Sequence, residues 1–243
     1  MPSADDLILA GLATLPAKST IASSQSAKKQ YSQEMSRVIA EALGQACRDR
    51  GMLGTRPAGP GAVGLSGAER RLAGGIGAKK VDVSWATEVD GLLFGASIKT
   101  INWRDGRSGN FQKNLTNRRE GMLFESVTLH RRFPFAVLSG FMFLDKDSRT
   151  DGTAKRNATF DNAFQRLRLF TGREDPAGRE EQYELLYIAS VDANPFGPNF
   201  EMFRADDPGT PVTVEHALDA IVSIIAERNF DSYEEGPPGH LRK

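Results

Sequence analysis

Two side chains of opposite charge stand where they could act together on a phosphodiester. Asp82 lies in a stretch, residues 79–85, whose side chains alternate as a strand requires, and Lys99 ends the next predicted strand, residues 92–100. An Asp-Gly pair between these strands favours a hairpin, which would bring the carboxylate and the ammonium to one edge of a sheet. A carboxylate can hold Mg²⁺, and a lysine beside the metal can orient water or stabilise developing negative charge. The pattern therefore favours phosphodiester hydrolysis.

Asp82 followed by Ser97-Ile98-Lys99 resembles the PD-(D/E)XK nuclease superfamily. The resemblance implies a restriction-endonuclease-like core and a Mg²⁺-dependent or Mn²⁺-dependent endonuclease that cuts DNA, with a role in restriction or phage defence. It implies that Asp82 is a metal ligand and that Lys99 positions or activates water.

This sequence has Ser97 where the family pattern has an acidic residue two positions before the lysine. Members with such a departure take the missing carboxylate from elsewhere, commonly from a neighbouring helix. Glu69, just before the first strand, is the expected second metal ligand, and Glu88 and Glu120 are further candidates. Ser97 is expected to add a hydroxyl to the site.

A basic stretch follows the predicted strand that ends at Lys99. From Lys99 to Arg119 there are six basic residues and a single acidic one, Asp105. Trp103 and Phe111 interleave with these charges and could stack on bases. The stretch predicts a DNA-binding surface, because a phosphate backbone needs such positive charge. The candidate binding residues are Arg104, Arg107, Gln112, Lys113, Asn114, Asn117, Arg118 and Arg119.

The elements around these residues predict an α/β fold with a mixed central sheet flanked by helices. Residues 135–144 form a nearly continuous apolar run, typical of a strand buried on both faces. Apolar residues recur at helical spacing in several other segments, and Thr213 is a suitable N-cap for the last of these. The expected helices are 4–13, 32–50, 114–132, 159–170 and 214–228, and the expected strands are 79–85, 92–100, 135–144 and 183–191.

The chain divides into three expected parts. Residues 1–31 include a Ser-rich polar stretch and are expected to form an arm or linker outside the core. Residues 32–230 are expected to form a single nuclease-like domain, and residues 231–243, rich in Pro and Gly, a flexible tail.

Composition excludes several other classes of protein. The 243 residues carry 31 basic and 31 acidic side chains, which argues against a binder held to nucleic acid by bulk charge. Cys47 is the single cysteine and the three histidines are far apart, which argues against a zinc site built from them. The first apolar run is too short to span a bilayer and lacks a basic leader, so a cytoplasmic protein that binds no membrane is expected.

Two alternatives to an enzyme stay open. A non-catalytic nucleic-acid-binding module on the same fold would explain Ser97 as a lost acid, with the basic stretch retained. A protein-interaction subunit would use the Gly/Pro-rich segment 51–67 and the termini. For the enzyme, cutting of both strands requires two sites and so favours a homodimer.

Overall fold

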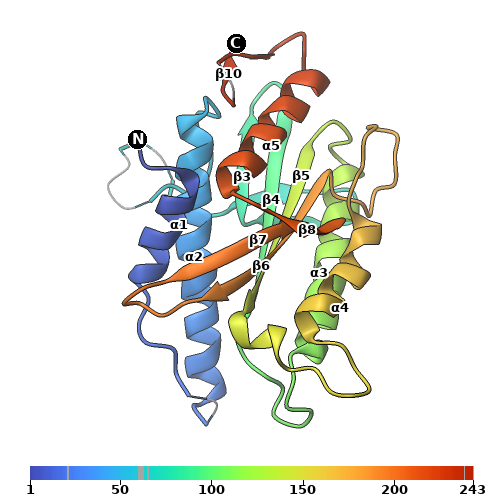
Figure 1. The fold of residues 1–243 in the computed structure, drawn as a ribbon. Coiled ribbons are helices and arrows are strands. Elements are labelled where there is room, and N and C mark those ends of the chain that lie inside the picture. Colours follow the sequence, from blue (N-terminus) through green and yellow to red (C-terminus); the bar gives the residue numbers. More distant parts are fainter. Residues whose placement is uncertain (21, 60–62, 65, 238, 243) are drawn as a thin grey trace.

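The protein has three layers, with a mixed β-sheet between two layers of helices (Figure 1). The computed structural model describes residues 1–20, 22–59, 63–64, 66–237 and 239–242. The helices α1, α2 and α5 cover one face of the sheet, and α3 and α4 cover the other. The helix bounds are α1 Ala4–Ala13, α2 Gln25–Asp49, α3 Gln112–His130, α4 Thr159–Leu167 and α5 Val214–Arg228, with short 3₁₀ turns at Lys146–Arg149 and Arg168–Phe170.

The central sheet confirms the predicted α/β class. The described residues form six strands in the order β3-β4-β5-β6-β7-β8. The pairs β4–β5 and β5–β6 are parallel, and the other neighbours are antiparallel. The predicted hairpin is the pair β3–β4, while β7 and β8 were not predicted, because β8 carries two prolines and an exposed, polar edge pattern. The strand bounds are β3 Val83–Thr87, β4 Gly91–Ile101, β5 Val137–Asp145, β6 Leu185–Asp192, β7 Asn199–Arg204 and β8 Asp207–Val212.

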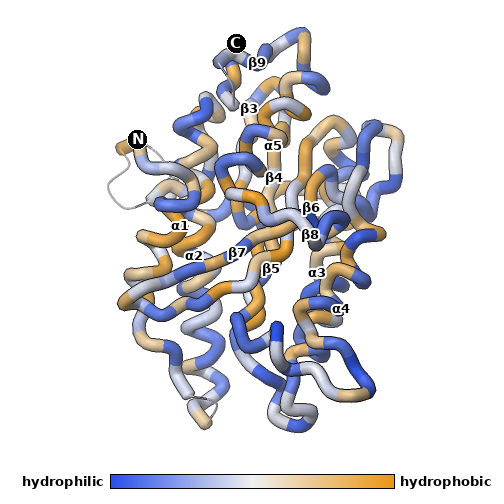
Figure 2. Tube along the Cα trace, viewed as in Figure 1, coloured by the Kyte–Doolittle hydropathy of each residue, from blue (hydrophilic) through white to orange (hydrophobic). Residues whose placement is uncertain are grey.

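Alternation along β5 builds a core on each side of the sheet. Phe141 and Phe143 pack with α1, α2 and α5, whereas Met142 and Leu144 pack with α3 and α4. All four are at most 1% exposed, as expected for successive side chains that point to opposite faces. Figure 2 shows the apolar colour concentrated in the sheet and on the inner sides of the helices.

The N-terminal segment belongs to the core, so the expectation of an arm outside it is wrong. Ile8 and Leu12 of α1 are fully buried among the side chains of α2 and α5. Ser24 caps α2 by accepting a hydrogen bond from the Ala27 amide at 3.2 Å, so this helix starts at Gln25. The Ser-rich stretch therefore contains a helix start.

The C-terminal segment also packs on the core, where a flexible tail was expected. The described residues of this segment form a short hairpin from β9 (Glu234–Glu235) and β10 (Leu241–Arg242). Tyr233 and Leu241 are buried in the core beside α5, and the Leu241 amide donates to the Arg50 carbonyl at 2.8 Å. Apolar contacts thus hold a segment whose Pro/Gly content predicts disorder.

The predicted strand 79–85 is divided at Asp82. Its first part, β2 (Ala78–Val81), pairs with β1 (Arg70–Ala73) in a separate two-stranded ribbon, and its second part is β3 of the central sheet. The bend between them falls at Asp82. No helix among the described residues is long and apolar enough to cross a membrane.

Candidate functional site

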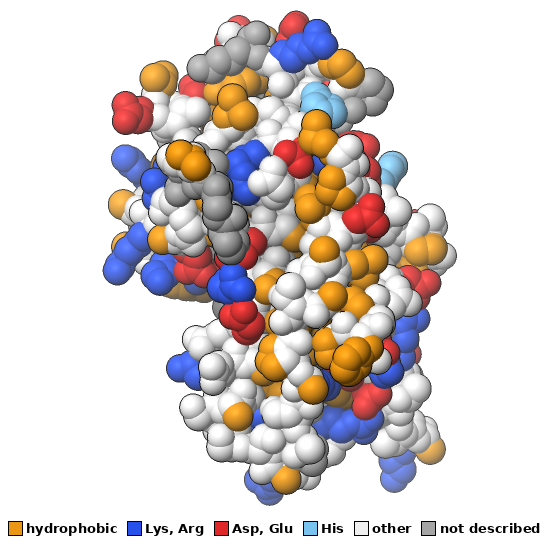
Figure 3. All heavy atoms as spheres, turned by 90° about the vertical axis from the view of Figure 1, so that its left-hand side faces the viewer, with side chains coloured by type: hydrophobic (Ala, Val, Ile, Leu, Met, Phe, Trp, Pro, Cys, Tyr) orange, Lys and Arg blue, Asp and Glu red, His pale blue; other side chains and the backbone are white. Residues whose placement is uncertain are grey.

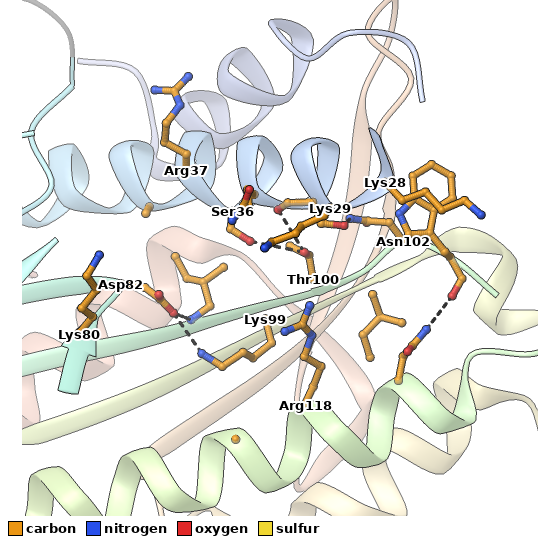
Figure 4. A pocket seen from close by; sticks show the side chains of 18 of the residues that line it. Lys28, Lys29, Ser36, Arg37, Lys80, Asp82, Lys99, Thr100, Asn102 and Arg118 are labelled. Carbon is orange, nitrogen blue, oxygen red and sulfur yellow. Dashed lines mark hydrogen bonds and ion pairs between the residues drawn. The ribbon is translucent and has the colours of Figure 1, made fainter. Parts of the chain in front are cut away.

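Asp82 and Lys99 meet at the edge of the sheet, as predicted. Lys99 projects from β4, and its Nζ lies 3.2 Å from Asp82 Oδ2. The same carboxylate oxygen accepts a hydrogen bond from the Ile98 amide at 2.6 Å. The bend between β2 and β3 allows this contact, because it turns Asp82 out of the ladder and toward the backbone of β4 (Figure 4).

A second carboxylate, Glu125, completes the cluster and was not predicted from the sequence. Glu125 lies on α3, is 2% exposed, and places Oε2 3.1 Å from Lys99 Nζ. The Ser97 hydroxyl donates to the same oxygen at 3.2 Å, and Lys79 Nζ lies 3.5 Å away. Ser97 therefore holds a carboxylate from a neighbouring helix, in place of supplying one itself.

Burial and charged neighbours shift the pKa values of Lys99 and Glu125. Burial opposes the charge on Lys99, but Glu125 and Asp82 outweigh it and raise the pKa of the ammonium above its ordinary value. Burial raises the pKa of Glu125, and Lys99 opposes that shift only in part. Lys99 thus stays protonated at neutral pH. The positive charge near Glu125 does not fully offset the cost of burying its carboxylate.

The donor set of the cluster suits a hard cation. Hydrogen bonds from the described residues reach Oδ2 of Asp82 and Oε2 of Glu125, and none reaches Oδ1 or Oε1. Those two oxygens are the type of ligand that Mg²⁺ and Mn²⁺ prefer. The described part of the chain brings no third His, Cys, Asp or Glu into such a group, so water and a substrate phosphate would have to complete the coordination.

Asp82 and Lys99 line the floor of a groove of about 1260 Å³, whereas Glu125, which is bonded to Lys99, is buried and does not line it. Helix α2 forms one wall, helix α3 the other, and β4 runs between them (Figure 4). Arg118 projects from α3 into the groove, beyond Lys99. On the outer surface that carries α1 and α2, basic side chains gather toward one edge (Figure 3).

The periodicity of α3 decides which of the predicted binding residues reach the groove. Asn114 and Arg118 line it, since they lie four residues apart on one face, and Arg104 lines it from the preceding loop. The Asn114 amide also donates to the Trp103 carbonyl at 3.1 Å, which ties the loop to the helix. The remaining predicted residues do not line the groove: Arg107, Gln112, Lys113, Asn117 and Arg119.

The two aromatic residues predicted to stack on bases lie in different environments. Phe111 is 1% exposed and belongs to the core under α3, so that prediction is wrong. Trp103 lines the end of the groove, packs edge-on against Tyr31 at 5.7 Å, and has Lys18 Nζ 4.8 Å from its ring centroid.

The wall formed by α2 was also missed by the sequence analysis. Its polar side chains follow the helical repeat in pairs four residues apart, and the structure turns this stripe toward the groove. Ser36 contributes a hydroxyl 3.4 Å from that of Thr100 on β4. These polar residues recur at helical spacing in the sequence, but the helix was predicted from its apolar residues alone. The lining residues are Gln25, Lys28, Lys29, Ser32, Gln33, Ser36 and Arg37.

The acidic residues proposed from sequence as second metal ligands do not join the cluster. Glu69 is exposed at the rim of the groove and forms an ion pair with Lys80 at 3.6 Å. Glu88 is exposed in the β3–β4 turn, and Glu120 is exposed on α3. A buried glutamate on the predicted helix takes the place expected for Glu69.

Comparison with known proteins gives no match: no family model matches the chain, and no curated protein or solved structure is significantly similar to it. The geometry of the cluster and the groove is therefore the evidence for function.

Proposed function

We propose that the protein is a metal-dependent endonuclease that hydrolyses phosphodiester bonds of DNA. The observation that carries the proposal is the convergence of Asp82 and Glu125 on Lys99, at the floor of a groove with basic walls that Asp82 and Lys99 line. Two carboxylates that share one buried ammonium retain acceptor capacity for a divalent cation, and the walls offer cations to a phosphate backbone. The two carboxylates around one lysine, together with the basic walls, also support the resemblance to the PD-(D/E)XK superfamily.

Within the cluster, the two carboxylates would bind the metal and the lysine would stabilise negative charge. Asp82 and Glu125 would hold Mg²⁺ or Mn²⁺ through the oxygens that no described residue occupies. When bound, the metal polarises the phosphate and lowers the pKa of a water ligand. Lys99 stays charged because of its two carboxylate neighbours, so it stabilises negative charge that develops on the phosphate and cannot act as a general base at neutral pH.

The ribbon of β1 and β2 offers a further contact for the backbone of DNA. Arg71 and Lys80 are exposed and directly opposite each other in its register. Like charges at opposed positions destabilise a ribbon unless an anion lies between them. Among the described residues, Glu69 offsets them, 3.6 Å from Lys80, and a phosphate would do so better.

The alternative is a non-catalytic DNA-binding module, favoured by the set of only two carboxylates among the described residues.

A restriction or phage-defence role would place the enzyme in the cytoplasm, and cutting of both strands would call for a homodimer.

The test is incubation of the purified protein with supercoiled plasmid, linear duplex and single-stranded DNA in Mg²⁺, Mn²⁺ or EDTA. Asp82→Ala and Lys99→Ala are run alongside, with Lys155→Ala as a control, because Lys155 is exposed in the loop before α4 and does not line the groove. The proposal expects metal-dependent cutting that the first two substitutions remove and the third retains. DNA binding without cutting in any metal would favour the module.

A further inference from the structure

Helix α3 presents a polar stripe to the groove with a gap in its middle. Asn114, Arg118, Gly121 and Glu125 follow each other at intervals of four, three and four residues, so they share one face of the helix. Asn114, Arg118 and Gly121 line the groove, and Glu125 holds Lys99 at its floor. Gly121 is therefore the position between the basic wall and the carboxylate cluster.

Packing does not explain a glycine at position 121. A Cβ added there would meet no heavy atom within 4 Å, although the residue lies in the middle of a 19-residue helix. Gly44 of α2 shows the opposite case, because a Cβ there would lie 2.6 Å from the Pro57 carbonyl oxygen. Glycine weakens a helix interior relative to alanine, so Gly121 lowers helix stability where folding alone would accept alanine.

The gap lies one helical turn from a cation to which no described residue is bonded. Arg118 is exposed, and among the described residues no hydrogen bond or ion pair reaches its guanidinium. A guanidinium binds a phosphate through two parallel N–H bonds. The aromatic side chain that could stack a base, Trp103, lies at the end of the groove by the Asn102–Gly106 loop.

We propose that the open notch at Gly121 is a subsite for a backbone phosphodiester of the nucleic acid, which approaches the α3 backbone there and is held by Arg118. The inference rests on the proposed function, since it assigns the substrate's path to the same groove. It adds that the phosphate next to the reacting one lies against α3, between the metal ligands and Asn114. A methyl group at position 121 would occupy this space.

Gly121→Ala and Asn117→Ala form a matched pair of variants for the test. Both place a better helix former on α3, but Asn117 is exposed on a part of the helix that does not line the groove. Binding of fluorescein-labelled duplex and single-stranded DNA is measured in EDTA by anisotropy, and thermal unfolding is recorded for each variant. We expect both to melt at or above the wild-type temperature, and Gly121→Ala alone to bind DNA about tenfold more weakly.

A double-mutant cycle with Arg118→Ala locates the effect. If one phosphate contacts both residues, Gly121→Ala costs less affinity in the Arg118→Ala background than in the wild type. Equal costs in the two backgrounds, or wild-type affinity of Gly121→Ala, would overturn the subsite.

The binding assay separates the subsite from the nuclease proposal because it needs no cleavage. Wild-type cutting combined with unchanged binding by Gly121→Ala overturns the subsite and leaves the nuclease. Weakened binding by Gly121→Ala, with no cutting by the wild type in any metal, overturns the nuclease proposal and leaves the subsite. A wild-type protein that binds no DNA overturns both.

Discussion

Two buried glutamates have almost equal exposure and opposite surroundings. Glu125 is 2% exposed and Glu184 is 3% exposed. Glu184 uses both oxygens: Oε2 accepts from His130 at 3.3 Å and from the Leu138 amide at 2.6 Å, and Oε1 accepts from Arg173 at 2.9 Å and Arg228 at 2.6 Å. Glu125 uses one oxygen, which accepts from Ser97 and Lys99 and lies 3.5 Å from Lys79 Nζ, and it shares Lys99 with Asp82.

This difference in partners reverses the direction of the pKa shift. Burial opposes ionisation of Glu184, but the hydrogen bond and charge of His130, the charge of Arg228 and the Leu138 amide outweigh it and lower its pKa to about 2. Burial raises the pKa of Glu125, and Lys99 compensates only in part. A saturated buried carboxylate thus joins elements of the fold, and an undersaturated one beside a groove is available to a cation.

The largest expected effect is loss of cleavage on removal of charge from the cluster. Asp82→Asn keeps the shape of the side chain but removes a metal ligand, so we expect the cleavage rate to fall by about a thousandfold. The rate is measured on plasmid in Mg²⁺, with thermal unfolding as the check on folding. A variant that melts normally and cuts at the wild-type rate would separate the cluster from catalysis.

The same substitution at the two glutamates should give opposite results. Glu184→Gln leaves Arg173 and Arg228 without their shared anion, so the free energy of unfolding should fall by about 3–5 kcal/mol while folded molecules still cut DNA. Glu125→Gln removes a carboxylate that burial disfavours, so stability should change by less than about 1 kcal/mol while cutting is lost. Urea unfolding and cleavage assays on both variants make the comparison. Equal destabilisation of the two variants would contradict the different roles assigned to Glu184 and Glu125.

Acid sensitivity should depend on Glu184. Its pKa falls from 4.5 to about 2 on folding, so its contribution is complete above pH 4.5 and is lost as the pH falls toward 2. Urea unfolding at a series of pH values should show this decline in the wild type. The decline should be shallower in Glu184→Gln, and an identical slope in both proteins would contradict the assignment.

Divalent metal should stabilise the folded state through the cluster. Mg²⁺ at ten times its dissociation constant should add about 1.4 kcal/mol, because the separated carboxylates of the unfolded chain bind it poorly. Thermal unfolding with and without Mg²⁺ should show the rise in the wild type and in Glu184→Gln, when each is compared with its own metal-free form. Glu125→Gln should show none, and a rise of the same size there would place the metal elsewhere.

The smallest effects are expected at single basic residues around the groove. Arg118→Ala and Lys80→Ala should each reduce the slope of log affinity against log salt by about one, because each removes one phosphate contact. Lys155→Ala serves again as the control. Binding titrations of labelled DNA in EDTA at several salt concentrations provide the measurement, and unchanged slopes would remove these residues from the interface.

Elements that depend on local pattern could be predicted from the amino-acid sequence. The period of two along β4, the apolar run of β5 and the helical repeat of α5 predicted those elements closely, and Thr213 caps α5 as expected, accepting from the His216 amide at 3.1 Å. The hairpin prediction placed Lys99 at the end of a strand beside the segment that carries Asp82. These predictions succeed because neighbouring residues share a face or a turn.

Partners that come from distant segments depend on how the helices pack on the sheet, so they could not be predicted from local pattern. The apolar residues of α3 do not mark one face of the helix clearly, so Glu125 could not be distinguished from Glu120 before α3 was packed on β4. The same holds for α1, whose short apolar run needed α2 and α5 to cover it. The bend at Asp82 arises because β2 and β3 pair with different strands, and that choice is made by the sheet as a whole.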